Sequence, residues 1–359
     1  MAIFPSKTDY LGVDLGGSSV KAIQLKNEAG RPKLISYGFV EQSTDIIKGD
    51  SQASQRKIID ALKKIIKEAK ISTKKTVAAL PSFTVFSSII SLPAMSQKDL
   101  FSAIRWEAKK FVPMPLEEMV LDWRLLKEEK KEINQSEQPP AVSKGPKALR
   151  VLLTAAPKNL VKRYIEIFTA AELQIISLET ESFALERALI GLDKSSIMIV
   201  DIGALATDIS VIQEGIPLLN RSIDVGGDTI TKAIANSLNI NIERAEQFKR
   251  DFGLSIAETS NSQIPKTIEF VFTSIINEIK YCFNLYKSQE DKPIEKIILS
   301  GGSAFLPNLP NYLSNVLNMK VVIGDPWSRV IYPVELKPAL DEIGPRFAVA
   351  IGLAMREIV

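Results

Sequence analysis

"YLGVDLGGSSVKAIQL", residues 10–25, joins an apolar strand to a turn made almost entirely of small residues. An acid, two glycines, two hydroxyls and a lysine interrupt the apolar alternation: Asp14, Gly16, Gly17, Ser18, Ser19 and Lys21. Backbone N–H groups of a glycine turn can approach an anion closely, because no side chain intervenes. We therefore predict two strands, 10–15 and 19–25, joined by an anion-binding turn.

The same pattern recurs later in the chain. "VDIGALATDISVI", residues 200–212, also reads as an apolar strand, Asp-x-Gly, a short turn and a second strand. Asp14 and Asp201 lie 187 residues apart, and a Gly-x-Pro turn follows each hairpin. The repeat indicates a duplicated lobe, with two facing hairpins that could hold a polyphosphate from both sides.

A third glycine turn, Gly301–Gly302, follows the strand "KIILS" and precedes a helix. Its flat backbone could lie against a nucleotide base. Any one of the three turns is also consistent with an ordinary structural turn, but the ordered set favours a nucleotide site. Neither a Walker phosphate loop nor a G-x-G-x-x-G after the first strand is present.

Residue chemistry narrows what such a site can do. The 359 residues include no histidine and one cysteine, Cys282, which excludes imidazole bases, Ser-His-Asp triads and internal disulfides. Asp14 and Asp201 could hold Mg²⁺, directly or through water. Lys21 and the hydroxyls of the two hairpins can reach the phosphate oxygens, from Ser18, Ser19 and Thr207.

Composition places the protein among soluble globular chains. Apolar content is 45%, and the net charge of +3 is too small to indicate nucleic-acid binding. The start lacks a signal-peptide pattern, and no run of about 18 apolar residues is present. We expect a cytoplasmic protein.

Local patterns predict the elements between the turns. Residues 55–70 form an amphipathic helix whose lysine face is solvated. Ser96 and Asp99 form a capping box that opens another helix. Residues 127–147 are predicted to be a solvated loop, and residues 346–359 a closing helix that runs to the last residue.

With these motifs the sequence resembles the actin-like ATPase superfamily, and within it the PilM family of type IV pilus assembly. "RWEAKKFVPMPLEEMVLDW", "DVGGDTITKAIA", "AEQFKRDFG" and "RFAVAIGLAMRE" carry the closer likeness. The resemblance implies an α/β, two-lobed actin-like ATPase fold of duplicated ribonuclease-H-like lobes, with a small inserted α+β subdomain. It places the first lobe at 1–197 and 335–359, with the insertion at 81–156. The second lobe spans 198–334, with a helical subdomain at 236–292.

The resemblance also implies roles for single residues, with ATP and Mg²⁺ as the cofactors. The two hairpins would bind phosphates through Asp14, Gly16, Gly17, Ser18, Ser19, Lys21, Asp201, Gly203, Thr207 and Asp208. A turn near the phosphates and ribose would contribute Gly226, Gly227 and Asp228. A helix beside the ribose and base would contribute Glu246 and Lys249, and the adenosine-binding turn would contribute Gly301, Gly302 and Ser303. Glu246 and Lys249 could instead form a surface ion pair. The second hairpin departs from a glycine-rich pattern, since it reads Ala204, Leu205 and Ala206.

Catalysis is the least defined role. Hydrolysis would need a group that orients water against the γ-phosphate. Glu181 stands where actin places such a glutamine, and Asp14 and Asp201 are the other candidate catalytic residues. Glu181 could equally be an acid favoured at a helix N-terminus. We expect nucleotide binding with at most slow ATPase activity.

The resemblance implies a scaffold that binds the N-terminal cytoplasmic tail of the membrane protein PilN, in a groove between the first lobe and the insertion. The protein would be held at the inner face of the cytoplasmic membrane by its partners and would not insert into the bilayer. It would also contact other pilus platform and motor proteins, and it could self-associate. The helix opened by Ser96 ends in "WEAKKFVPMP" and offers apolar anchors for the tail near this groove, although we expect most of them in the core: Trp106, Phe111, Val112 and Met114. The alternatives are an FtsA-like membrane-associated polymer and a small-molecule kinase.

Overall fold

The computed structural model describes residues 8–41, 51–126, 149–255, 263–290 and 292–359, so the predicted loop at 127–147 lies outside the described residues. The chain divides into two compact units. One comprises Met1–Phe83 with Tyr164–Val359, and the other is Thr84–Arg163. We describe each unit by itself.

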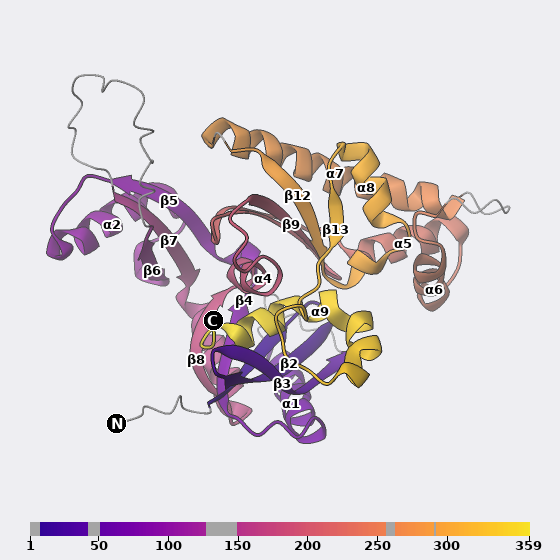
Figure 1. Cartoon of the computed structure of the whole chain (residues 1–359), viewed down its shortest axis with the longest axis horizontal. Coiled ribbons are helices and arrows are strands. Elements are labelled where there is room, and N and C mark those ends of the chain that lie inside the picture. The colour runs from indigo at the N-terminus through magenta and orange to yellow at the C-terminus, as the bar shows by residue number, and fades with distance from the viewer. Residues whose placement is uncertain (1–7, 42–50, 127–148, 256–262, 291) are drawn as a thin grey trace. The chain divides into compact units, whose positions relative to one another are not determined.

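The larger unit contains two five-stranded sheets of the same design (Figure 1). Their orders are β3-β2-β1-β4-β8 and β11-β10-β9-β12-β13. In each sheet the first three strands are antiparallel and the last two run parallel to the central one. The strands are β1 (Asp9–Leu15), β2 (Ser19–Glu28), β3 (Arg31–Glu41), β4 (Lys75–Leu80), β8 (Gln174–Thr180), β9 (Ser196–Ile202), β10 (Thr207–Gln213), β11 (Ile216–Ile223), β12 (Ile294–Ser300) and β13 (Val321–Ile323). The duplication predicted from the two Asp-x-Gly hairpins is therefore present in the topology.

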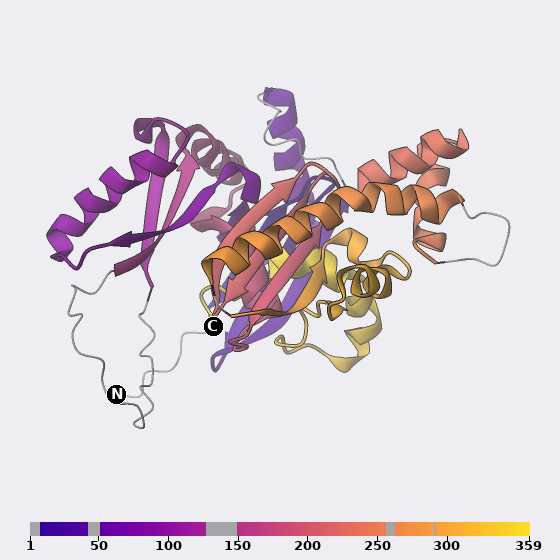
Figure 2. The same ribbon diagram turned by 90° about the horizontal axis from the view of Figure 1, so that it is seen from above.

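Helices cover the faces of both sheets. They are α1 (Gln52–Glu68), α3 (Lys158–Ala170), α4 (Glu181–Leu189), α5 (Gly227–Leu238), α6 (Ile242–Phe252), α7 (Gln263–Gln289), α8 (Leu309–Leu317) and α9 (Lys337–Met355). In Figure 2, α7 crosses the strands of the second sheet, where Phe272, Ile275 and Ile279 belong to the core. None of the described helices is long and apolar enough to cross a bilayer.

Helix α9 differs from its prediction at both ends. It begins at Lys337, because Pro338 is tolerated in the first turn and Pro345 is accommodated inside the helix. It ends at Met355 rather than at Val359, since Arg356 donates its N–H to the Leu353 carbonyl in a tighter turn. The carbonyl of Pro345 accepts the N–H of Gly301 at 3.1 Å, which ties α9 to the third glycine turn.

Backbones meet directly where α9 packs between β1 and α4. A Cβ atom at Gly12 would collide with the Ala350 carbonyl, and one at Gly352 would collide with the Ala184 carbonyl. Close packing of this kind leaves no room for even a methyl group. The glycines therefore set the spacing of the three elements.

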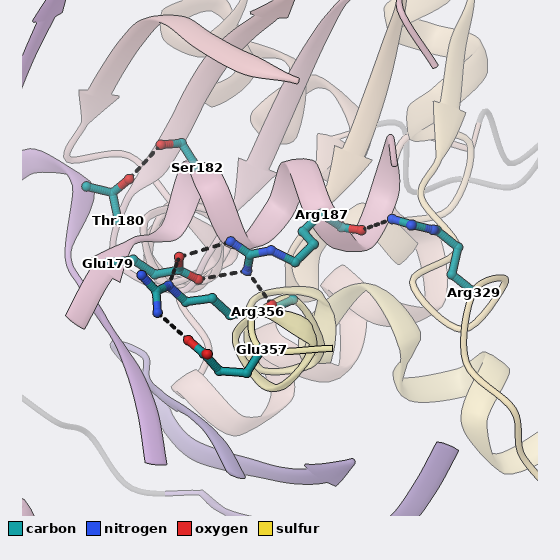
Figure 3. Close-up of polar contacts among 8 residues, drawn as sticks. Glu179, Thr180, Ser182, Arg187, Arg329, Arg356 and Glu357 are labelled. Atoms are coloured by element: carbon teal, nitrogen blue, oxygen red, sulfur yellow. Dashed lines mark hydrogen bonds and ion pairs between the residues drawn. The ribbon is translucent and has the colours of Figure 1, made fainter. Parts of the chain in front are cut away.

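A charged network joins the same helices (Figure 3). Arg187 on α4 makes a bidentate contact with Glu179 on β8, at 2.8 and 3.0 Å, and also donates to the Gly352 carbonyl. Arg356, after α9, reaches the same carboxylate at 3.3 Å. Arg329 donates to the backbone carbonyl of Arg187. The network holds the end of β8, α4 and α9 in fixed relation.

The smaller unit packs helix α2 on a three-stranded sheet. The sheet order is β5 (Phe86–Leu92), β7 (Leu149–Pro157), β6 (Met119–Leu125), and α2 spans Gln97–Phe111. Ser96 caps α2 as predicted, accepting the Asp99 N–H at 3.3 Å. The core is lined by Leu100, Ile104 and Ala108.

The expectation that most of four apolar residues around the end of α2 are core residues was wrong. Only Val112 is buried, whereas Trp106 is 67% exposed and Phe111 and Met114 also face solvent. Trp106 lies on the helix face roughly opposite Ile104, and Phe111 is at the last turn, where the sheet no longer covers it.

Candidate functional site

The two Asp-x-Gly hairpins lie together in the larger unit. A methyl group at Gly17, in the first turn, would lie 2.8 Å from Cγ of Leu205 in the second turn. Asp14 and Asp201 stand near the ends of β1 and β9, just before these turns. The sequence argument required that the two turns face each other, and their contact satisfies that requirement.

In the first hairpin, Asp14 already forms an ion pair with Lys21. Asp14 and Lys21 face each other across β1 and β2, and Lys21 Nζ donates to Asp14 Oδ2 at 2.7 Å. Both side chains are about nine-tenths buried. Ser19 is buried beside them, and Ser18 is exposed in the turn.

In the second hairpin, two acids face each other instead. Asp201 pairs with Asp208 across β9 and β10. Burial raises the pKa of Asp201 to about 6; the nearby Ser300 hydroxyl acts in the opposite direction, and the charge of Asp14 adds to the rise. Burial and the charge of Asp201 raise the pKa of Asp208 to about 7. This pair therefore favours a proton or a cation between the strands.

Glu181 lies close to the same acids. Its Oε2 accepts the backbone N–H of Ser82 at 3.1 Å and the Ser82 hydroxyl at 3.0 Å. Burial, followed by the charges of Asp208, Asp14 and Asp201, raises the pKa of Glu181 well above 4.5. A protonated carboxyl resembles a carboxamide in shape and hydrogen-bonding capacity. Sequence reasoning missed Ser82, which had no motif to mark it.

A second group of predicted residues gathers at the start of α5. Lys249 Nζ lies 2.6 Å from Glu246 Oε2 and donates to Thr231 Oγ1 at 2.9 Å and to the Gly227 carbonyl at 3.2 Å. Burial alone would raise the pKa of Glu246, but hydrogen bonds from Lys249 and Thr231 lower it below 4.5. Thr231 was missed, although it lies one helical turn after Gly227.

The glycine turn of β12 adjoins both groups. A Cβ at Gly301, which has φ of +82°, would meet the Ile202 carbonyl and approach Asp201 Oδ1 at 2.9 Å. A Cβ at Gly227 would lie 2.9 Å from Ser303 Oγ. Gly302 instead faces the aliphatic part of Arg346, with ordinary spacing of 3.7 Å. The three glycine turns therefore converge on one region.

Three of the predicted nucleotide-binding residues already use polar groups for hydrogen bonds within the protein. Thr207 is fully buried, and its hydroxyl donates to the Val225 carbonyl at 2.6 Å. The N–H groups of Gly227 and Asp228 donate to the carbonyls of Gly203 and Ala204, each at 2.9 Å. These groups brace the second hairpin against α5.

The acidic and basic side chains of this region suit a nucleotide with its metal better than a metal ion bound without a nucleotide. Among the described residues, no group of three or more acidic, cysteine or histidine side chains could hold a metal. Asp208 Oδ1 is buried without a hydrogen-bond partner, and Lys21, paired with Asp14, is a buried cation in the first hairpin. Mg²⁺ commonly takes one or two carboxylates and completes its shell with phosphate oxygens and water.

A family model described as "Type IV pilus assembly protein PilM" matches residues 12–358. The chain belongs to this family. A chain of a solved PilM–PilN type IV pilus biogenesis complex is 26% identical, with a TM-score of 0.82, and the match covers 98% of this chain and 99% of that one. The PilM resemblance read from the sequence is thus confirmed.

More distant relatives confirm the superfamily. The cell division protein FtsA of Agrobacterium fabrum is 28% identical over a 176-residue alignment, and the match covers 43% of this chain and 38% of that protein. An ADP-bound MreB from Spiroplasma citri shares the fold, with a TM-score of 0.53 and 15% identity over 97% of this chain and 95% of that one. The predicted two-lobed actin-like ATPase fold is confirmed.

Proposed function

We propose that this PilM-family protein is an ATP-binding scaffold of type IV pilus assembly that binds the N-terminal tail of PilN. The convergence of the two hairpins and the Gly301–Gly302 turn carries the nucleotide part of the proposal. Membership of the PilM family and the match to a PilM–PilN complex support the partner. Through PilN the protein would lie at the inner face of the cytoplasmic membrane.

In this proposal the nucleotide lies between the hairpins, with Mg²⁺ neutralising part of the phosphate charge. Lys21 contributes a fixed positive charge, and Asp201 with Asp208 attracts the metal. Lys249 and Glu246 stand beside the ribose and base. Glu181, held by Ser82, is the residue best placed to orient water, and its raised pKa favours the protonated carboxyl, which can hydrogen-bond a water molecule but cannot accept its proton. We therefore expect slow turnover.

Titration with ATP and Mg²⁺ tests the nucleotide site. We expect wild-type protein to bind, and Asp14→Ala and Gly302→Arg to bind at least about tenfold more weakly, a loss of about 1.4 kcal/mol. Circular dichroism checks that both variants fold. Binding that survives both changes, or a folded wild-type protein that binds no nucleotide, would refute the site.

For the PilN tail we propose a hollow of about 550 Å³ along β8 and α3, lined by apolar residues that include Ile165, Leu173 and Ile176. β8 is the last strand of its sheet as described, and an extended peptide can add to such an edge while its side chains enter apolar hollows. The support is the combination of a strand edge and half-exposed isoleucines: Ile165 is 48% exposed and Ile176 is 39% exposed.

A synthetic PilN tail and a matched pair of variants test this location. Ile176→Asp should weaken binding at least about tenfold, because a carboxylate would enter an apolar hollow. Ile35→Asp is the control, since Ile35 is 45% exposed on β3, the strand at the other end of the same sheet. Equal losses in the two variants would argue against the β8 location. Predicted contacts with other platform or motor proteins, and self-association, stay predictions.

A further inference from the structure

The second hairpin carries one residue that phosphate binding does not explain. Leu205 is 46% exposed at the turn between β9 and β10, flanked by Ala204 and Ala206. An apolar side chain donates nothing to a phosphate, and leaving half of a leucine in water is unfavourable. Its position therefore calls for a role other than anion contact.

The Leu205 side chain contacts the opposite hairpin at Gly17. A Cβ atom built at Gly17 would lie 2.8 Å from its Cγ, 2.9 Å from Cδ1 and 3.3 Å from Cβ. The leucine side chain thus contacts the turn at Gly17, and a methyl group at Gly17 would force this side chain to move. The contact joins the β1–β2 hairpin of one sheet to the β9–β10 hairpin of the other.

The contact lies beyond the charged groups along both chains. Asp14 and Asp201 stand near the strand ends, while Gly17 and Leu205 lie in the turns that follow. Separating the two hairpins requires breaking this apolar contact, in which none of the charged groups takes part.

We propose that Leu205 is a clasp between the two phosphate hairpins that slows nucleotide exchange. The inference rests on the proposed nucleotide site and adds its regulation. The clasp is apolar, so it holds the turns together without accepting hydrogen bonds from the donors of the hairpins. The contact also explains why the second hairpin, residues 203–206, carries a leucine at position 205 instead of another glycine.

Release of a fluorescent ATP analogue, measured by stopped flow with excess unlabelled ATP, tests the clasp. Leu205→Ala should release the analogue about tenfold faster, which corresponds to a loss of about 1.4 kcal/mol of retention. Leu205→Gln, of similar length but polar, should behave like alanine. Leu205→Met, which stays apolar and can repack, should remain within about twofold of wild type. Leu192→Ala is the control, because Leu192 is 92% exposed on the surface.

A double-variant cycle tests whether the clasp acts through Gly17. Gly17→Ala should speed release, because its new methyl group meets Leu205. In the pair Gly17→Ala with Leu205→Ala that collision disappears, so release should be no faster than in Leu205→Ala alone. An unchanged rate in Leu205→Ala, or rate increases that multiply in the pair, would overturn the clasp. Wild-type protein that binds no nucleotide overturns the proposed function, and the clasp with it.

Discussion

Lys21 and Asp208 occupy equivalent places in the two hairpins, yet they carry opposite charges. Lys21 stands across the strand pair from Asp14, and Asp208 stands across the corresponding pair from Asp201. One half of the duplicated fold therefore has an internal ion pair, whereas the other has two facing acids. The asymmetry leaves the second hairpin as the half that favours a proton or a cation between its strands.

Stability should depend on pH through these acids. The pKa of Asp201 is raised to about 6 and that of Asp208 to about 7, against an ordinary 3.8. The folded protein keeps protons that the unfolded chain releases, so stability falls as pH rises from about 4 to about 7.

Asp208→Asn should flatten this decline by on the order of 2–3 kcal/mol, because the amide carries no charge at any pH. The measurement is urea unfolding of nucleotide-free protein at several pH values and constant ionic strength. Asp251→Asn, which changes an exposed acid in α6, is the control. A wild-type protein as stable at pH 7.5 as at pH 5 would contradict the prediction.

Lys21→Met should destabilise the fold by about 3–5 kcal/mol, since it leaves the buried carboxylate of Asp14 without its partner. Lys33→Met breaks the exposed pair with Glu28, whose side chains are 40% and 49% exposed, and should cost less than about 1 kcal/mol. Chemical denaturation gives both values, and comparable losses would be inconsistent with the burial of the first pair.

Arg187→Lys should lower stability by about 2 kcal/mol, because lysine cannot make the forked contact with Glu179 and also reach the Gly352 carbonyl. Arg356→Lys changes a more exposed partner of the same carboxylate and should have a smaller effect. Thermal melting of the two variants ranks them. The reverse order would show that Arg356, rather than Arg187, holds β8 to the helices.

Gly352→Ala should be among the most damaging single methyl additions, at about 3 kcal/mol or more, since the new carbon meets the backbone of α4. Gly302→Ala adds the same methyl group where the nearest atom is 3.7 Å away, and stability should change by less than about 0.5 kcal/mol. Soluble yield and melting temperature report both. A well-folded Gly352→Ala protein would mean that α4 and α9 can move apart.

Sequence patterns predicted the fold in detail because its strong signals are local and repeated. The spacing of Asp14 and Asp201 revealed the duplication, and alternation located the strands. The end of the closing helix was predicted four residues late, because hydrophobic periodicity continues through Ile358 while the backbone tightens after Met355. The exposure of Trp106 follows from helical periodicity, since Leu100, Ile104 and Ala108 mark the buried face of α2 and Trp106 lies roughly opposite it; the expectation of a core position gave more weight to its apolar character.

The candidate site was predictable where glycine and aspartate mark it, and less so elsewhere. The i, i+3 spacing of Glu246 and Lys249 predicted that both lie on one helix face. In the structure the two form an ion pair, and Lys249 also donates to the Gly227 carbonyl. It did not indicate that the Thr207 hydroxyl is engaged with Val225. It also gave no sign of Ser82 or Leu205, because their roles depend on contacts across long separations in the chain.

Ser82 has a further consequence through its place in the chain. It holds the carboxylate of Glu181, and the smaller unit begins two residues later at Thr84. The chain passes between the two units twice, at Phe83–Thr84 and at Arg163–Tyr164. A substitution at the first passage would therefore be expected to disturb the two hydrogen bonds that position Glu181.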